Sequence, residues 1–345
     1  MSDSLHLSVL DLIPVRTNQS SADAVAGALA LAQLADRLGY ERYWFAEHHN
    51  MASVASTTPP VLIAAVAATT ERIRVGSGGV MLPNHSPLVV AEQFAALEAI
   101  APGRIDLGIG RAPGSDPVIT QLLRLSGTTS DVDRFPDNIA DILSLLSTDG
   151  ATLRLTSGRE YDIRATPAAA AVPTLWLLGS SDYSAKLAAS LGLPYVFANH
   201  FSGDGIEAAL HHYRTGYQPS EAHPEPRTFL TVNASVAPTK EEAYDRALPQ
   251  LRTMARLRLG RPMHALETVD EALAAEPDAM SDEVIAAMAG RWIIGDAAQA
   301  IDAVRRLSSQ YGVDEVMISP IAGARAAEPA GAGRTQTLEL LAGAL

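Results

Sequence analysis

Short runs of aliphatic and β-branched residues alternate with longer Ala- and Leu-rich stretches along almost the whole chain. The runs have the length of buried strands, and the stretches repeat their apolar residues at helical spacing. The expected strands are 5–12, 40–46, 73–82, 104–110, 174–179, 194–199, 227–237 and 314–319, and the expected helices are near 22–38, 59–70, 87–100, 133–147, 182–190, 203–215, 240–258 and 296–310. This alternation predicts an α/β fold, a (β/α)8 TIM barrel that forms one domain over residues 1–345.

A doubly wound parallel sheet uses the same alternation and is the alternative fold. It is disfavoured because no G-x-G-x-x-G motif follows the first expected strand. The sequence therefore favours the closed barrel over the open sheet.

Two segments interrupt the alternation and are expected to be insertions. Residues 151–163 predict a β-hairpin with Ser157 and Gly158 at its turn. Residues 259–292 predict a loop followed by two short helices. Insertions of this size in a barrel often shape or cover the active site.

Composition excludes several classes of function. The formal net charge of −13 disfavours nucleic acid and anionic membranes as partners. The chain has no cysteine, so it has no disulfide, no thiolate metal ligand and no thiol nucleophile. No basic segment precedes the N-terminal apolar run, and no apolar run has the roughly 18 residues of a membrane span. We therefore expect a cytoplasmic protein.

Polar side chains and glycines gather where the expected strands end. In a (β/α)8 barrel the active site lies at the carboxyl ends of the strands, so these residues are the candidates for a ligand site. They are Asp11, Glu47, His48, His49, Ser77, Gly78, Gly79, Asn84, His85, Gly108, Gly110, Arg111, Gly179, Ser180, Ser181, Asn199 and His200.

Two neighbouring strand ends suggest an anion site. After the fifth strand a helix is expected to begin with Ser180, Ser181 and Ser184, whose hydroxyls lie beside the free N–H groups of the first helical turn. Arg111 follows the fourth strand directly and can reach across the barrel to a phosphate. The alternatives are that Ser180 or Ser181 only caps the helix, and that Arg111 pairs with Asp116 on the surface.

Glu47, His48 and His49 form an unusual end to the apolar second strand. A metal site is disfavoured, because successive strand residues point to opposite faces and no H-E-x-x-H motif occurs. At most one or two of the three side chains are expected to face the cavity. A neutral histidine there can take or give a proton near pH 7, although either histidine can instead hold a loop by hydrogen bonds.

Three segments resemble the bacterial luciferase-like flavin monooxygenases, namely residues 40–50, 73–114 and 177–199. The similarity runs in order from the first strand to the C-terminal helix, and the block 73–114 is the most specific part. The resemblance implies a single-subunit oxidoreductase with a (β/α)8 barrel, an insertion, and FMN or, in some branches, the deazaflavin F420 as cofactor.

The resemblance also implies roles for individual residues. The catalytic residues are His48 and its neighbour Glu47, and no metal is expected. Arg111, Ser181 and Ser184 hold the flavin phosphate, and the ring lies against a non-proline cis peptide that matches Gly78–Gly79. The full set of implied cofactor-binding residues is Gly78, Gly79, Arg111, Gly179, Ser180, Ser181, Ser184 and Asn199.

Two positions depart from the light-emitting members of the family. Gly110 stands where those proteins have a reactive cysteine, and Asn50 stands where they have an aromatic residue. Light emission from a long-chain aldehyde is therefore not expected. The likeness is closer to single-subunit oxidoreductases, which are often homodimers.

The expected function is an FMN-dependent monooxygenase. Reduced FMN from a separate flavin reductase reacts with O2 to give a flavin hydroperoxide, which transfers one oxygen atom to a small organic substrate. His48 acts as acid or base, and the 259–292 insertion helps to exclude water.

Two alternatives remain open. An F420-dependent hydride-transfer enzyme needs more basic residues near the phosphate than the sequence shows beyond Arg111. A non-catalytic flavin-binding or partner subunit has no need for Glu47, His48 and Arg111.

Overall fold

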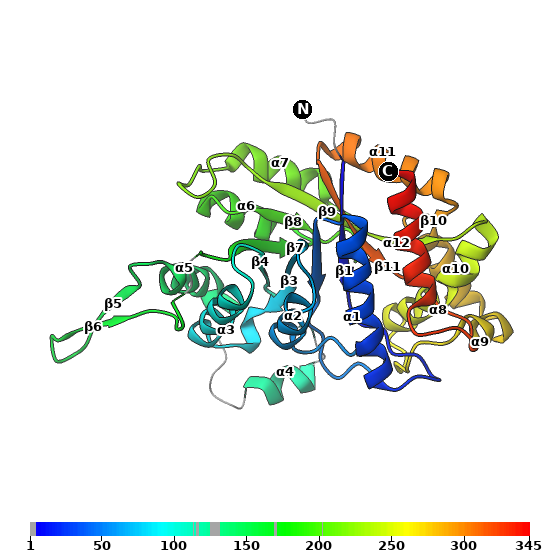
Figure 1. The fold of residues 1–345 in the computed structure, drawn as a ribbon, viewed down its shortest axis with the longest axis horizontal. Helices are drawn as coiled ribbons and strands as arrows, with labels where there is room; N and C mark the ends of the chain where they lie inside the picture. The colour runs from blue at the N-terminus through cyan, green and yellow to red at the C-terminus, as the bar shows by residue number, and fades with distance from the viewer. Residues whose placement is uncertain (1–4, 113, 115–116, 125–131, 169–170, 202) are drawn as a thin grey trace.

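Parallel strands form a closed barrel with helices around it (Figure 1). The computed structural model describes residues 5–112, 114, 117–124, 132–168, 171–201 and 203–345. The barrel strands are β1 (His6–Asp11), β2 (Arg42–Phe45), β3 (Arg74–Met81), β4 (Ile105–Gly110), β7 (Thr174–Gly179), β8 (Tyr195–Phe197), β9 (Thr228–Val236) and β11 (Glu315–Pro320). Pairing of β8 with β9 closes the sheet. This confirms the TIM barrel and every strand expected from the sequence.

Every expected helix is also present. These helices are α1 (Ser21–Leu38), α2 (Pro59–Ala67), α3 (Pro87–Ile100), α5 (Phe135–Leu146), α6 (Asp182–Leu191), α7 (Ile206–Gly216), α8 (Lys240–Arg258) and α11 (Ala297–Tyr311). A further helix, α12 (Ala332–Ala344), packs near α1 and α11. None of the helices among the described residues is both long and apolar enough to cross a membrane.

The sequence did not predict four short elements. They are α4 (Pro117–Arg124), β10 (Ile293–Gly295), which pairs with β9, and the 3₁₀ turns η1 (Leu82–Asn84) and η2 (Val132–Arg134). Each element has too few residues for the spacing of its apolar positions to distinguish a helix or strand from a loop.

Local signals explain where the helices begin and end. The Ser20 hydroxyl accepts a hydrogen bond from the Asp23 N–H, and the Asp23 carboxylate accepts one from the Ser20 N–H, so α1 starts with a capping box. Gly39 ends α1 with φ of 83°, a conformation that glycine adopts without steric cost. Pro87 opens α3, where its missing N–H has no helical partner to lose.

Both expected insertions are confirmed. Strands β5 (Ala151–Arg154) and β6 (Glu160–Ile163) form an antiparallel hairpin with Gly158 at its turn. Residues 259–292 contain a loop and the helices α9 (Val269–Ala274) and α10 (Ala279–Ala289). The Leu266 N–H donates to Val15 O, which ties this insertion to the loop after β1.

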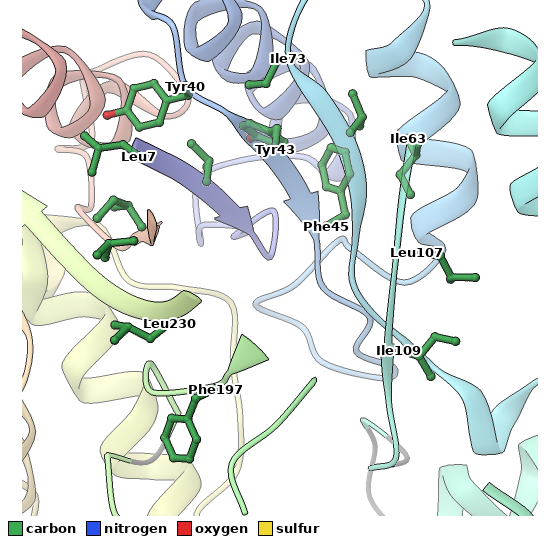
Figure 2. Close-up of a cluster of buried hydrophobic side chains, with 14 of the residues drawn as sticks. Leu7, Tyr40, Tyr43, Phe45, Ile63, Ile73, Leu107, Ile109, Phe197 and Leu230 are labelled. Carbon is green, nitrogen blue, oxygen red and sulfur yellow. The ribbon is translucent and has the colours of Figure 1, made fainter. Parts of the chain in front are cut away.

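Two apolar layers stabilise the barrel. Figure 2 shows part of the larger one, between the outer faces of the strands and the helices, with Tyr43, Phe45, Leu107 and Ile109 fully buried. The smaller layer fills the inside of the barrel with Leu10, Trp44, Ala46, Trp176, Val196, Phe229 and Met317. A barrel of this kind is a packed core, so a ligand has to bind at one of its ends.

A buried ionic network closes the amino end of the barrel. Arg42 on β2 is only 2% exposed and donates to Asp106 at 2.7 Å and to Glu315 at 2.6 Å. Asp106 also accepts from Arg74 at 2.7 Å and from Trp44 Nε1 at 3.1 Å. Burial alone would raise the pKa of Asp106, but the charges of Arg42 and Arg74 lower it. This end is occupied by paired charges, which leaves the opposite end for a site.

We expect Asp106→Asn to lower the free energy of unfolding by about 3 kcal/mol or more, because it leaves Arg42 buried with one carboxylate fewer. Urea denaturation at pH 7 measures the change. The matched control is Glu41→Gln, since Glu41 is 42% exposed and lies 4.0 Å from Arg42; its effect should stay within about 0.5 kcal/mol. If both variants lowered the free energy of unfolding by the same small amount, Asp106 would not be needed to stabilise the buried charge of Arg42.

Candidate functional site

The carboxyl ends of the barrel strands bring the sequence-predicted residues to one rim. Glu47 and His48 follow β2, Gly78 and Gly79 lie near the end of β3, and Arg111 follows β4. Gly179 ends β7 and Asn199 follows β8. Because the neighbouring barrel strands are parallel, these ends lie at the same edge of the sheet.

Glu47 is completely buried and connects two loops of the rim. Its Oε1 is 2.7 Å from His49 Nε2 and 2.8 Å from His85 Nε2, and its Oε2 accepts from the Met81 N–H at 2.9 Å. A carboxylate only accepts hydrogen bonds, so both histidines donate through Nε2–H. Glu47 therefore fixes the loops after β2 and β3 relative to each other.

These hydrogen bonds keep the Glu47 carboxyl group ionised. Burial alone would raise the pKa of its carboxyl, but hydrogen bonds from His49, His85 and the Met81 N–H lower the pKa to about 2. Glu47 is thus ionised at neutral pH and cannot donate a proton there. His85 was among the rim residues of the sequence, but nothing in the local pattern showed that it would meet a glutamate 38 positions earlier.

His48 differs from His49 in its contacts. Its backbone N–H donates to Ser56 O, while its Nδ1 is buried and has no hydrogen-bond partner among the described residues. Burial lowers the pKa of His48, and the nearby charge of Glu47 opposes this in part. The side chain is neutral near pH 7 and can exchange a proton with a ligand.

His200 is a second histidine of this rim, and no specific role for it was predicted from the sequence. Its Nδ1 is hydrogen-bonded to the Thr231 hydroxyl, and its carbonyl oxygen accepts from Asn233 Nδ2 at 2.8 Å. Burial, together with the proximity of His48, lowers its pKa to about 4. The only signal in the sequence was its position directly after Asn199 at the end of a strand.

The Gly78–Gly79 peptide is cis, as the resemblance implied. A Cβ on residue 79 would lie 2.7 Å from Gly108 O, and one on residue 78 would lie 2.6 Å from Leu10 Cδ1. Strand β4 is therefore too close for a side chain at residue 79, and the Leu10 and Trp44 side chains leave no room for one at residue 78. The register between these strands shifts at the same point.

Arg111 and the start of α6 come together, as the sequence predicted. The Arg111 guanidinium carbon lies 4.0 Å from the centre of the Tyr183 ring, and Tyr183 is in the first turn of α6. Ser181 occupies the N-cap position, but its side chain makes no capping hydrogen bond. This argues against the alternative that it serves only as a cap. Asp116, the other suggested partner of Arg111, lies outside the described residues.

The remaining predicted residues surround the same helix start and the next loop. Ser184 is buried, and its Oγ lies 2.6 Å from where a Cβ on Gly179 would be, so only glycine fits there. Ser180 is half-buried between Gly179 and Ser181. Asn199 is half-buried in the loop after β8, where its N–H donates to Phe197 O at 2.9 Å.

The 259–292 insertion borders the rim on the side of β8. Arg258, at the end of α8, donates to Phe201 O at 3.4 Å. Arg291, just after α10, lies 3.7 Å from Asp204. Both contacts connect the ends of the insertion to the loop that contains Asn199 and His200. Among the described residues, no group of three or more His, Asp or Glu side chains is arranged to hold a metal ion.

A model of the luciferase-like monooxygenase family matches residues 5–315, so the chain belongs to this family and is an oxidoreductase of the monooxygenase kind. It is 37% identical over 317 residues to a luciferase-like monooxygenase of Escherichia coli (strain K12), with 90% of both chains covered. It is 33% identical to the N-acetyl-S-alkylcysteine monooxygenase of Bacillus subtilis (strain 168), covering 93% of this chain and 94% of that protein. The family resemblance seen in the sequence is thereby confirmed.

Solved structures agree with this assignment. The structure of apo-MsnO8 has a TM-score of 0.85 and 34% identity, and the match covers 99% of this chain and 97% of that one. The oxygenating constituent of 3,6-diketocamphane monooxygenase from Pseudomonas putida, in complex with FMN, shares the fold at 16% identity (TM-score 0.69; 98% and 97% covered). So does an F420-dependent secondary alcohol dehydrogenase at 15% identity (TM-score 0.68; 99% of each chain covered).

The lowered pKa of Glu47 predicts a pH-dependent contribution to stability. A carboxyl with a pKa of about 2 in the folded protein and 4.5 ordinarily contributes about 3 kcal/mol above pH 4.5, and this is lost as the pH falls through 2. We expect Glu47→Gln to be less stable by about this amount at pH 7, with a smaller difference at pH 3.5. Urea denaturation of both proteins at pH 7 and at pH 3.5 measures the difference in the free energy of unfolding. Exposed Glu221→Gln is the control, and a pH-independent difference for Glu47→Gln would rule out the linkage.

Proposed function

We propose that this protein is an FMN-dependent monooxygenase that uses reduced FMN from a separate flavin reductase, together with O2, to oxygenate a small organic substrate. The observation that carries the proposal is the placement of Arg111 over Tyr183 at the start of α6, on the same rim as His48, whose Nδ1 has no hydrogen-bond partner in the part of the chain that the structure describes. The first feature suits a phosphate and the second suits a reacting group beside it.

The phosphate would lie at the start of α6. Arg111 supplies a positive charge, and stacking on Tyr183 limits the positions that its guanidinium can take. Ser181 leaves its hydroxyl free of the helix, and Ser180 and Ser184 lie beside it. We assign these residues and Gly179 to phosphate binding.

The ring would lie against the Gly78–Gly79 peptide, where neither residue carries a side chain. Asn199, in the loop after β8, would contact it from the other side of the rim. When bound, FMN supplies the atom that reacts with oxygen, and the protein supplies orientation and exclusion of water. The 259–292 insertion, which contacts the loop of Asn199, would contribute to that exclusion.

His48 would hold or accept the proton that the reaction moves. It is neutral at pH 7 because burial lowers its pKa, and its Nδ1 has no partner in the described structure. Glu47 would act on the geometry of the site, since its oxygens are used by His49, His85 and Met81. We therefore place His48 in proton transfer and Glu47 in positioning.

The charges near α6 favour FMN over F420. F420 carries a long acidic tail and needs several cations beyond its first phosphate. Among the described residues of this helix, Lys186 pairs with Asp182 at 2.5 Å, which leaves Arg111 as the cation for a single phosphate. A homodimeric state and a cytoplasmic location remain predictions of the sequence, and the organic substrate is not defined by these residues.

We expect Arg111→Ala to weaken the binding of FMN about 10- to 100-fold, because a charge-assisted hydrogen bond to the phosphate is lost. The binding of riboflavin, which has no phosphate, should change less than about twofold. Titration of protein fluorescence with each ligand gives the two dissociation constants. Equal losses for FMN and riboflavin would place Arg111 away from the phosphate.

Mixing the anaerobic protein and reduced FMN with air-saturated buffer in a stopped-flow spectrometer tests the function itself. We expect a transient absorbance of the oxidising flavin that is absent without protein. It should decay faster in His48→Gln, because a glutamine side chain does not exchange a proton near pH 7. The protein should bind reduced F420 tightly only if it is the alternative, an F420-dependent hydride-transfer enzyme. Tight F420 binding without any FMN transient would replace the monooxygenase with that alternative.

A further inference from the structure

Met81 ends β3 with its side chain on the inner face of the barrel. The preceding residue, Val80, pairs with Ile109 of β4, and both belong to the outer apolar layer. Successive strand residues point to opposite faces, so the next pair along the two strands, Met81 and Gly110, faces inward. At the carboxyl end of a strand, this face lines the rim that holds the candidate site.

The sulfur of Met81 lies over Gly110. A Cβ on residue 110 would be 3.2 Å from Met81 Sδ, and a Cβ on Gly114 would be 3.0 Å from Met81 Cγ. The side chain therefore lies between the end of β4 and the loop that follows Arg111. Glycine at both positions leaves room for a long thioether side chain there.

Met81 is held at the rim by its backbone and lies outside the core. Its N–H donates to Glu47 Oε2 at 2.9 Å. Its side chain is partly buried and, among the described residues, belongs to neither apolar layer of the barrel. Two other methionines differ clearly, since Met317 is fully buried inside the barrel and Met280 on α10 is 59% exposed.

A thioether at this place has a chemical property that a purely space-filling residue lacks. Methionine sulfur accepts an oxygen atom from a peroxide and becomes a sulfoxide. The flavin ring proposed above lies against the Gly78–Gly79 peptide, and Met81 is two positions after Gly79, about 7 Å along the strand. The Met81 side chain is long enough to bring its sulfur to the edge of that ring site.

We propose that Met81 is a site of self-oxidation: when no organic substrate is bound, Met81 Sδ accepts the outer oxygen of the flavin hydroperoxide and becomes methionine sulfoxide. This inference rests on the proposed function. The O–O bond breaks and an S–O bond forms. Sulfur loses two electrons, the peroxide gains them, and the remaining hydroxyflavin releases water to give oxidised FMN. Reduced FMN and O2 are the only co-reactants.

The modification changes a wall of the site. Oxidation converts a flexible apolar side chain into a polar one. The added oxygen has to fit beside Gly110 and close to the Glu47 carboxylate, which accepts from the N–H of the same residue. Turnover without substrate therefore inactivates the enzyme gradually, whereas a bound substrate takes the oxygen atom and protects Met81.

Peptide mass spectrometry tests the modification. The protein is taken through repeated cycles of reduced FMN and isotopically labelled O2, without substrate and with catalase to remove free hydrogen peroxide. We expect Met81 to gain one labelled oxygen atom, with a modified fraction about 10-fold or more above that of Met280. Met280 is the internal control, because its exposed side chain reacts with free peroxide. Dilute hydrogen peroxide without flavin should reverse the order of the two residues.

Met81→Leu tests the consequence, because leucine has nearly the same volume as methionine and no sulfur. We expect the amplitude of the stopped-flow transient to fall over successive cycles in the wild type and to stay constant in Met81→Leu. Met280→Leu is the matched control and should behave as the wild type does. Circular dichroism checks that both variants are folded.

The outcomes separate this inference from the proposed function. A transient with FMN but no labelled oxygen on Met81 would overturn the inference and leave the proposed function standing. Equal labelling of Met81 and Met280 would also overturn it, because free peroxide accounts for that result. Absence of the transient would remove the proposed function and this inference together.

Discussion

Closure of the sheet by β8 and β9 is the constraint on which the rest of this structure depends. Every strand of a closed parallel barrel ends on the same rim, so residues far apart in the chain meet there whatever their separation in sequence. The two ends of the barrel then differ in chemistry. Arg42 and Arg74 pair with Asp106 and Glu315 at the amino end, so these four charges are used within the protein. Binding groups remain at the carboxyl end.

At that end, one buried carboxylate organises its neighbours. Glu47 stays ionised because three donors surround it: His49 in the loop after β2, the Met81 N–H at the end of β3 and His85 in the loop after β3. These loops flank both His48 and the Gly78–Gly79 peptide. A buried charge is stable only when its hydrogen bonds are complete, so the contacts of Glu47 also help to fix the position of His48 relative to the proposed ring site.

The proposed phosphate site depends on two features that carry more information together than either does alone. A serine-rich helix start is common, and so is an exposed arginine after a strand. The structure adds the stacking of Arg111 on Tyr183 and shows that the Ser181 side chain makes no capping hydrogen bond, and neither follows from the residue types alone. The two insertions serve different sides of the molecule: residues 259–292 border the rim beside β8, while the hairpin projects past α5.

The sequence by itself determined the strands, most helices, the barrel and the candidate rim, because apolar spacing, proline and glycine act over a few residues. It missed α4 and β10, whose lengths are below that signal. Only the tertiary structure decided that His85 joins Glu47, that His48 Nδ1 is buried without a hydrogen-bond partner among the described residues, and that His200 lies near His48. Hydrogen-bond partners and burial are set by the closed barrel, and no local pattern encodes which distant side chain will complete a buried charge.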